Sequence, residues 1–115
     1  MVAEMPSEQI QNLEKLLDSP RDGALLRYSL GTAYLKAGEL ERALEQLHEA
    51  LARDPRYSAA WKTLGTALAE AGRDDEALAT WRHGIAAAHE KGDRQAEKEM
   101  TVFVRRLEKR LDRAE

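Results

Sequence analysis

The chain contains an internal repeat with a period of 34 residues. At this distance the two segments that align are LRYSLGTAYLKAGELERALEQLHEAL and AWKTLGTALAEAGRDDEALATWRHGI. The residues matched between them are small or apolar, and include Leu30 and Leu64, Gly31 and Gly65, Gly38 and Gly72, and Ala43 and Ala77. Each segment has the pattern of two short amphipathic helices joined by a glycine turn. A repeat of this length predicts a fold made by stacking one helical unit.

Composition favours one small, soluble helical domain. Of the 115 residues, 43% are hydrophobic but only 5% are aromatic, so alanine and leucine must do most of the core packing. The net charge of -3 argues against general affinity for nucleic acid. No cysteine is present, which excludes disulfides, thiolate metal sites and thiol catalysis. Since neither a secretory signal nor a run of ~18 apolar residues is visible, we expect a cytoplasmic protein that does not enter a membrane.

Helical spacing and helix-breaking residues predict about six helices and no strands. Ser7 is placed to cap the first helix, which should stop before Pro20. Gly38 and Gly72 are each suited to end the first helix of a repeat, because glycine adopts the left-handed conformation at low cost. We predict a single helical repeat domain, 1–115, whose parts are an N-terminal helix at 7–19, a first repeat at 24–57, a second repeat at 58–91 and a C-terminal capping helix at 93–113.

The repeat resembles the tetratricopeptide repeat family. In the second repeat, the residues that carry the resemblance are Trp61, Leu64, Gly65, Leu68, Ala77 and Trp81. In the first repeat, they are Leu30, Gly31, Tyr34, Ala43, Leu47, Ala50 and Pro55. Three positions depart from the family pattern: Arg27 replaces a tryptophan, Gly84 an alanine and His89 a closing proline. The resemblance implies an all-α fold, a right-handed α-α superhelix of antiparallel helix pairs.

Two glycines lie inside predicted helices, where glycine costs about 1 kcal/mol relative to alanine. These are Gly31 and Gly65, at equivalent positions of the two repeats. We expect a close helix crossing at each, in which Gly31 lets Ala43 approach and Gly65 lets Ala77 approach. Larger side chains there would force the paired helices apart.

The last predicted helix has one apolar stripe, made of Ala96, Met100, Phe103, Val104, Leu107 and Leu111. When the last helix is aligned with the second repeat at a shift of 35 residues, Met100 aligns with Gly65. Methionine therefore occupies the position at which a repeat has a glycine that leaves room for the following helix. We therefore expect that no partner helix approaches Met100 and that this helix caps the stack. A dimerisation helix is the alternative, because the stripe would run for about 31 Å. The polar side of the helix is biased toward positive charge by Arg105, Arg106, Lys109, Arg110 and Arg113.

The sequence shows no constellation of residues for catalysis, a metal or a cofactor. His83 and His89 are six residues apart and point to different sides of one helix, which is not a zinc spacing. The serines lack a nucleophile-elbow context, and the glycines are spread singly, so no phosphate loop is formed. We expect a protein that is not an enzyme and that uses no cofactor.

The resemblance implies that the first helix of each repeat lines a concave groove for a peptide or a partner helix. Because the signature residues fill the packing side of that helix, the groove would use its other stripe. The residues predicted to bind the partner are Leu25, Tyr28, Thr32, Leu35 and Lys36 in the first repeat, and Lys62, Thr66 and Glu70, with Ala59 and Ala69 beside them, in the second. Tyr28 makes an anchor, and Lys62 is suited to meet a carboxylate or a backbone carbonyl. The set of basic and amide residues with which some family members grip a C-terminal carboxylate is incomplete here.

We therefore expect a non-enzymatic interaction scaffold that binds a protein or peptide. Two alternatives stay open. In the first, the predicted binding stripe is a surface without a partner or is covered by the first helix. In the second, the chain is a self-associating structural protein, such as a homodimer, that uses the last helix or the open groove. The sequence predicts neither the identity of the partner nor the pathway.

Overall fold

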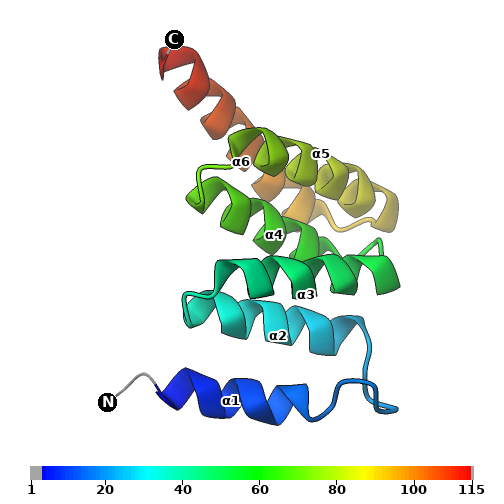
Figure 1. Cartoon of the computed structure of the whole chain (residues 1–115). Coiled ribbons are helices and arrows are strands. Elements are labelled where there is room, and N and C mark those ends of the chain that lie inside the picture. Colours follow the sequence, from blue (N-terminus) through cyan, green and yellow to red (C-terminus); the bar gives the residue numbers. More distant parts are fainter. Residues whose placement is uncertain (1–3, 115) are drawn as a thin grey trace. The chain divides into compact units, whose positions relative to one another are not determined.

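The computed structural model describes residues 4–114 of the chain. Over these residues it contains helices and no strand, which confirms the predicted all-α class (Figure 1). The helices are α1 (Glu4–Glu14), α2 (Ala24–Lys36), α3 (Leu40–Arg53), α4 (Ser58–Glu70), α5 (Asp74–Lys91) and α6 (Arg94–Ala114). The chain divides into two compact units, Met1–Pro55 with α1 to α3 and Arg56–Glu115 with α4 to α6. That the two units form the single domain of the sequence prediction stays a prediction.

The first helix differs in its bounds from the expected range of 7–19. α1 begins before Ser7 and ends at Glu14, so Ser7 lies within the helix and is not its cap. Beyond Glu14 the chain continues in tight turns, in which the amide of Leu16 donates to the carbonyl oxygen of Leu13 at 3.0 Å. Asp18 then adopts a left-handed conformation with φ 61°, which is incompatible with a helix that continues to Pro20.

The first unit has an apolar core between α1, α2 and α3. Its buried members are Ile10, Leu26, Leu30, Ala33, Tyr34 and Ala43, and the partly buried residues packed against them are Leu13, Leu16, Leu17, Leu35 and Ala37. The hydroxyl of Tyr34 donates a hydrogen bond to the carboxylate of Glu14, which ties the end of α1 to α2. Burial and this hydrogen bond together raise the pKa of Tyr34 to about 12.

Arg27 stands where the family pattern has tryptophan, and it binds neighbours through polar contacts instead. Its Nε lies 2.9 Å from Oδ1 of Asp22 and its second guanidinium nitrogen 2.8 Å from Oδ2. A further nitrogen donates to the side chain of Gln46 in α3 at 3.2 Å. Only 12% of the Arg27 side chain and 9% of the Asp22 side chain are exposed. The pair therefore joins the loop before α2 to the α2–α3 helix pair.

The predicted glycine turns close each helix pair. Gly38 has φ 78° and Gly72 has φ 80°, the left-handed region that glycine adopts without steric cost. In both repeats the amide of the next residue donates to the carbonyl oxygen five residues back, at 2.9 Å. The two turns are copies of one another, as the repeat predicts.

The close crossings at the helical glycines are present, and the side chains of a leucine and a tryptophan lie nearest to the two glycines. A Cβ added to Gly31 would lie 2.7 Å from Cγ of Leu47, whereas Ala43 offers only its carbonyl oxygen, at 3.4 Å. A Cβ on Gly65 would overlap the indole of Trp81. Ala43 therefore approaches Gly31 through its backbone, as expected, but the side chain nearest to each glycine is the larger one a turn later, Leu47 or Trp81.

In the second unit α5 packs against both α4 and α6. Met100 of α6 is fully buried, and its sulfur lies 2.5 Å from where a Cβ on Gly84 of α5 would stand. The expectation that no helix approaches Met100 was wrong, because α6 turns this residue back onto the helix before it. The other buried members of the predicted apolar stripe are Ala96, Val104 and Leu107.

Candidate functional site

The predicted binding stripe of the first unit lies on α2 and is unequally exposed. Leu25 is 69% exposed, and Lys36 is also exposed. Tyr28 and Thr32 are half-buried, and the Thr32 hydroxyl donates to the carbonyl oxygen of Ser29 at 2.9 Å. Leu35 packs against the core of the unit, so its side chain is engaged within the protein. An apolar side chain, Leu25, is thus exposed near the start of α2, and a cation, Lys36, is exposed at its end.

The predicted stripe of the second unit lies on α4. Its cation is already paired, because Nζ of Lys62 lies 2.8 Å from Oε1 of Glu99 on α6. The Thr66 hydroxyl donates to the carbonyl oxygen of Lys62 at 3.0 Å, and Glu70 is exposed. The hydrogen bond and the positive charge of Lys62 lower the pKa of Glu99 below its ordinary value of 4.5. A ligand carboxylate would therefore have to compete with Glu99 for Lys62.

A pocket of about 380 Å³ lies between α4, α5 and α6 of the second unit. We call it the α4–α6 pocket; its lining is Thr66, Ala69, Glu70, Trp81, Phe103, Arg106, Leu107 and Arg110. The rings of Trp81 and Phe103 are 5.3 Å apart between centroids and tilted by 46°. The indole nitrogen of Trp81 donates to the carbonyl oxygen of Lys62 at 3.2 Å. Two of the three predicted α4 residues, Thr66 and Glu70, thus border an aromatic surface.

Ala69, which also lines the pocket, belongs to the predicted stripe, whereas the lining residues on α5 and α6 were not predicted as a site. Phe103 and Leu107 appeared in the sequence as part of the apolar stripe of the last helix, and Arg106 and Arg110 as part of its basic side. Their meeting with α4 depends on how α6 packs, which helical periodicity does not determine. Arg110 also lies 3.3 Å from Oδ1 of Asp74 at the start of α5, so its charge is partly compensated.

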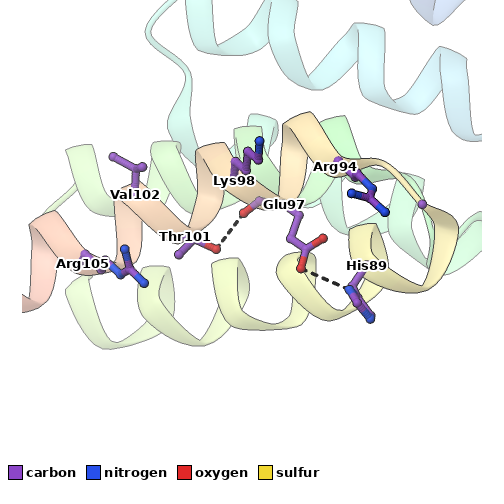
Figure 2. A pocket seen from close by; sticks show the side chains of 8 residues that line it. His89, Arg94, Glu97, Lys98, Thr101, Val102 and Arg105 are labelled. Atoms are coloured by element: carbon purple, nitrogen blue, oxygen red, sulfur yellow. Dashed lines mark hydrogen bonds and ion pairs between the residues drawn. The ribbon is translucent and has the colours of Figure 1, made fainter.

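A second, larger pocket of about 660 Å³ lies along α5 and α6. We call it the α5–α6 pocket; its lining is His89, Gly92, Arg94, Glu97, Lys98, Thr101, Val102 and Arg105. Figure 2 shows Glu97 of α6 pointing to His89 of α5, where Oε2 and Nδ1 are 3.2 Å apart. The Thr101 hydroxyl donates to the backbone carbonyl oxygen of Glu97 at 2.7 Å. The two pockets share no residue.

Two of the histidines contact different side chains. His83 stacks on Trp61 with ring centroids 5.6 Å apart, and His89 meets Glu97. Among residues 4–114, no group of three or more histidine, aspartate or glutamate side chains is placed to hold a metal ion. Within the same residues, no helix is both long enough and apolar enough to cross a membrane.

These features define a helical repeat protein, and comparison with known proteins identifies the family. The chain belongs to the tetratricopeptide repeat family, since a family model described as "Tetratricopeptide repeat" matches residues 12–91. It is 51% identical over 100 residues to "TPR repeat-containing protein PA0015" of Pseudomonas aeruginosa, covering 87% of this chain and 95% of that protein.

Solved structures agree with this family. The solution structure of protein BPP2914 from Bordetella parapertussis matches with a TM-score of 0.77 and 42% identity, covering 88% of each chain. The crystal structure of a tetratricopeptide repeat domain protein from Salinibacter ruber matches with a TM-score of 0.70 and 29% identity, covering 76% of this chain and 97% of that one. The tetratricopeptide repeat fold generally mediates protein–protein interaction, and proteins of this family are generally non-catalytic scaffolds.

Proposed function

We propose that this protein binds a short peptide or a segment of a partner protein, and that the α4–α6 pocket holds one side chain of that segment. The observation that carries the proposal is the meeting of Thr66 and Glu70 with Trp81 and Phe103 around one pocket. The pocket volume of about 380 Å³ is within the range of sites that hold a small ligand or a side chain.

The chemistry of the pocket favours an apolar or aromatic side chain. Trp81 and Phe103 both line the pocket, and aromatic rings contribute most of the binding energy at many interfaces. The rim is polar, with Glu70 on α4 and Arg106 on α6. Arg106 makes no ion pair with any residue that the structure describes, so its guanidinium is available to a backbone carbonyl or a carboxylate of the segment.

The first unit adds a separate surface to the proposal. Leu25 and Tyr28 lie one turn apart on one face of α2, and Leu25 is the more exposed. We assign them to a separate contact with a partner protein, with Lys36 two turns further along the helix. Leu35 supports α2 from the core side and does not bind in this account.

The test selects peptides from a random library displayed on phage, using immobilised protein as bait. Ala69→Arg places a long side chain in the α4–α6 pocket, and Ala86→Arg makes the same change at an exposed site of α5 outside both pockets. Peptides that bind the wild type and Ala86→Arg but lose binding to Ala69→Arg would support the proposal. Peptides that bind all three proteins equally, or no enrichment by the wild type, would contradict it.

Self-association is the second candidate, and Leu25 is the observation that favours it. An apolar side chain that is 69% exposed is suited to meet a second copy. The apolar stripe of α6 is a poor candidate for this, since four of its six members are buried within the second unit. Sedimentation equilibrium of the wild type and Leu25→Glu tests the point: a dimer that Leu25→Glu dissociates would favour self-association, whereas a monomer in both proteins would exclude it over the concentrations used.

A further inference from the structure

The α5–α6 pocket gathers positively charged side chains that form no ion pair with the part of the chain whose side chains are described. Arg94, Lys98 and Arg105 line it and make no ion pair among residues 8–114. The pocket's one carboxylate, on Glu97, is directed at His89 (Figure 2). In a chain with a net charge of -3, three unpaired cations around one pocket form a local field of the opposite sign.

The cations share one face of α6. At 3.6 residues per turn, Arg94, Lys98 and Arg105 fall within a narrow arc of the helix, with Thr101 between them. The first and the last of the three are separated by about 16 Å along the helix axis, at 1.5 Å per residue. The residues of α6 that line the α4–α6 pocket fall on the opposite face. A ligand at one pocket therefore leaves the other accessible.

The same face also offers an apolar contact. Val102 is 40% exposed and, with Leu25, is one of two large hydrophobic residues that are exposed where the structure describes side chains. Along the helix it lies between Lys98 and Arg105. Along the pocket, cationic side chains are therefore followed by an apolar side chain and then by another cation.

We propose that the α5–α6 pocket binds an acidic peptide segment in which one apolar side chain stands between carboxylates. The apolar side chain would contact Val102, and the flanking carboxylates would pair with Lys98 and Arg94 at one end and with Arg105 at the other. An extended chain rises about 3.3 Å per residue, so about five residues span the three cations. This site goes beyond the proposed function, because it uses none of the residues of the α4–α6 pocket.

The chemistry of the pocket favours a protein over a nucleic acid as the source of the negative charge. Proteins that hold single-stranded nucleic acid stack its bases on aromatic side chains, and the pocket contains no phenylalanine, tyrosine or tryptophan. A continuous phosphate backbone would also meet the carboxylate of Glu97. A peptide can instead place its own carboxylates beside the cations and an apolar side chain between them.

The test uses a fluorescein-labelled peptide, GEELEEG, in a titration followed by fluorescence anisotropy at low salt, where exposed charges are least screened. Comparison peptides are GEESEEG, which lacks the apolar side chain, and GKKLKKG, which reverses the charge; a twelve-nucleotide oligo(dT) tests the nucleic-acid alternative. We expect GEELEEG to bind more tightly than the other three probes. Amide shifts in the NMR spectrum of the labelled protein should be centred on Lys98, Val102 and Arg105.

Two double variants give matched controls on one helix. Arg94→Glu with Lys98→Glu removes the proposed cations, and Lys109→Glu with Arg113→Glu makes the same change in charge outside both pockets. We expect the first to weaken GEELEEG binding roughly tenfold or more, since each exposed charge pair contributes about 0.2–1 kcal/mol and reversal adds repulsion. The second should change binding little. Circular dichroism of both variants is the check that they are folded.

Four results would overturn the proposal. These are no binding of GEELEEG to the wild type, equal loss in both double variants, equal affinity for GEESEEG, and tighter binding of the oligonucleotide than of the peptide. The last result would assign the pocket to nucleic acid. Because neither double variant touches the α4–α6 pocket, peptides selected for that pocket should bind both variants as they bind the wild type.

Discussion

The sulfur of Met100 lies 2.5 Å from where a Cβ on Gly84 would stand, so the absence of a side chain on α5 makes room for the long one on α6. Cβ of Trp61 lies 2.6 Å from the same point. Gly84 departs from the family's alanine, and Met100 replaces the glycine of a repeat. The two departures therefore compensate each other in volume, and together they allow α6 to pack closely against α5.

Gly84→Ala should destabilise the protein by about 1–3 kcal/mol, because the new methyl group overpacks a full site. Met100→Ala should cost about 2–5 kcal/mol through the cavity it leaves. The double variant should lose less stability than the sum of the losses in the two single variants, since removing Met100 vacates part of the space that the methyl group needs. Cβ of Trp61 still crowds the methyl group, so the compensation should be partial. Urea denaturation of the four proteins measures this coupling. Additive effects would show that Met100 does not occupy the space beside Gly84.

The two helical glycines should differ in their tolerance of alanine. Gly65→Ala gains about 1 kcal/mol of helix propensity but sets a methyl group against the rigid indole of Trp81. We expect a net loss of about 1–2 kcal/mol. Gly31→Ala meets the side chain of Leu47, which can shift its rotamer, and should cost less than about 1 kcal/mol.

Denaturant unfolding of both variants tests the order of these effects. Ala79→Gly, at an exposed site of α5, supplies the control for helix propensity alone and should cost about 1 kcal/mol. A larger loss in Gly31→Ala than in Gly65→Ala would contradict the packing described at the two crossings.

The pairing of Asp22 with Arg27 should make the stability of the protein depend on pH in the acidic range. The hydrogen bonds from Arg27 and from the amide of Asp18 hold the pKa of Asp22 at about 2, against an ordinary value of 3.8. A lowered pKa stabilises the folded state at pH values above the ordinary pKa of the aspartate. This contribution is lost as the pH falls from about 4 to about 2. Asp22→Asn should be less stable than the wild type at pH 7, and the difference should shrink across that window. Curves of unfolding free energy that stay parallel from pH 5 to pH 2 would contradict the assignment.

Lys62 should control the ionisation of Glu99. In Lys62→Met the pKa of Glu99 should rise toward its ordinary value of 4.5, because the ammonium group that lowers it is gone. NMR titration of the glutamate carboxyl carbons measures this, with Lys109→Met as the control that leaves Glu99 unchanged. Stability should change little, since the two side chains are 34% and 39% exposed. An unaltered Glu99 pKa would mean that the two groups are not paired in solution.

The repeat was enough to predict the helix pairs and their turns. Gly38 and Gly72 recur at the repeat period, and both have the left-handed conformation that a helix end of this kind requires. Local signals served less well at the N-terminus. Ser7 has the chemistry of a cap, but the helix that contains it starts earlier.

Contacts between helices were the harder part. The spacing of small residues showed that Gly31 and Gly65 lie at crossings, but not that Leu47 and Trp81 would fill them. Lys62 was predicted to lie on a binding face, but the sequence did not show that Glu99, 37 residues away, would reach it. The α4–α6 pocket likewise depends on the packing angle of α6, which periodicity along one helix does not determine.

NMR mapping of a selected peptide shows whether the α4–α6 pocket holds a side chain of a bound segment. The peptide enriched by the wild type is added to isotope-labelled protein, and the amide shifts are followed to saturation. We predict that the largest shifts cluster at Thr66, Glu70 and Phe103 and vanish in Ala69→Arg, while Ala86→Arg behaves as the wild type. Saturable binding with shifts confined to other residues, or unchanged binding to Ala69→Arg, would contradict the account.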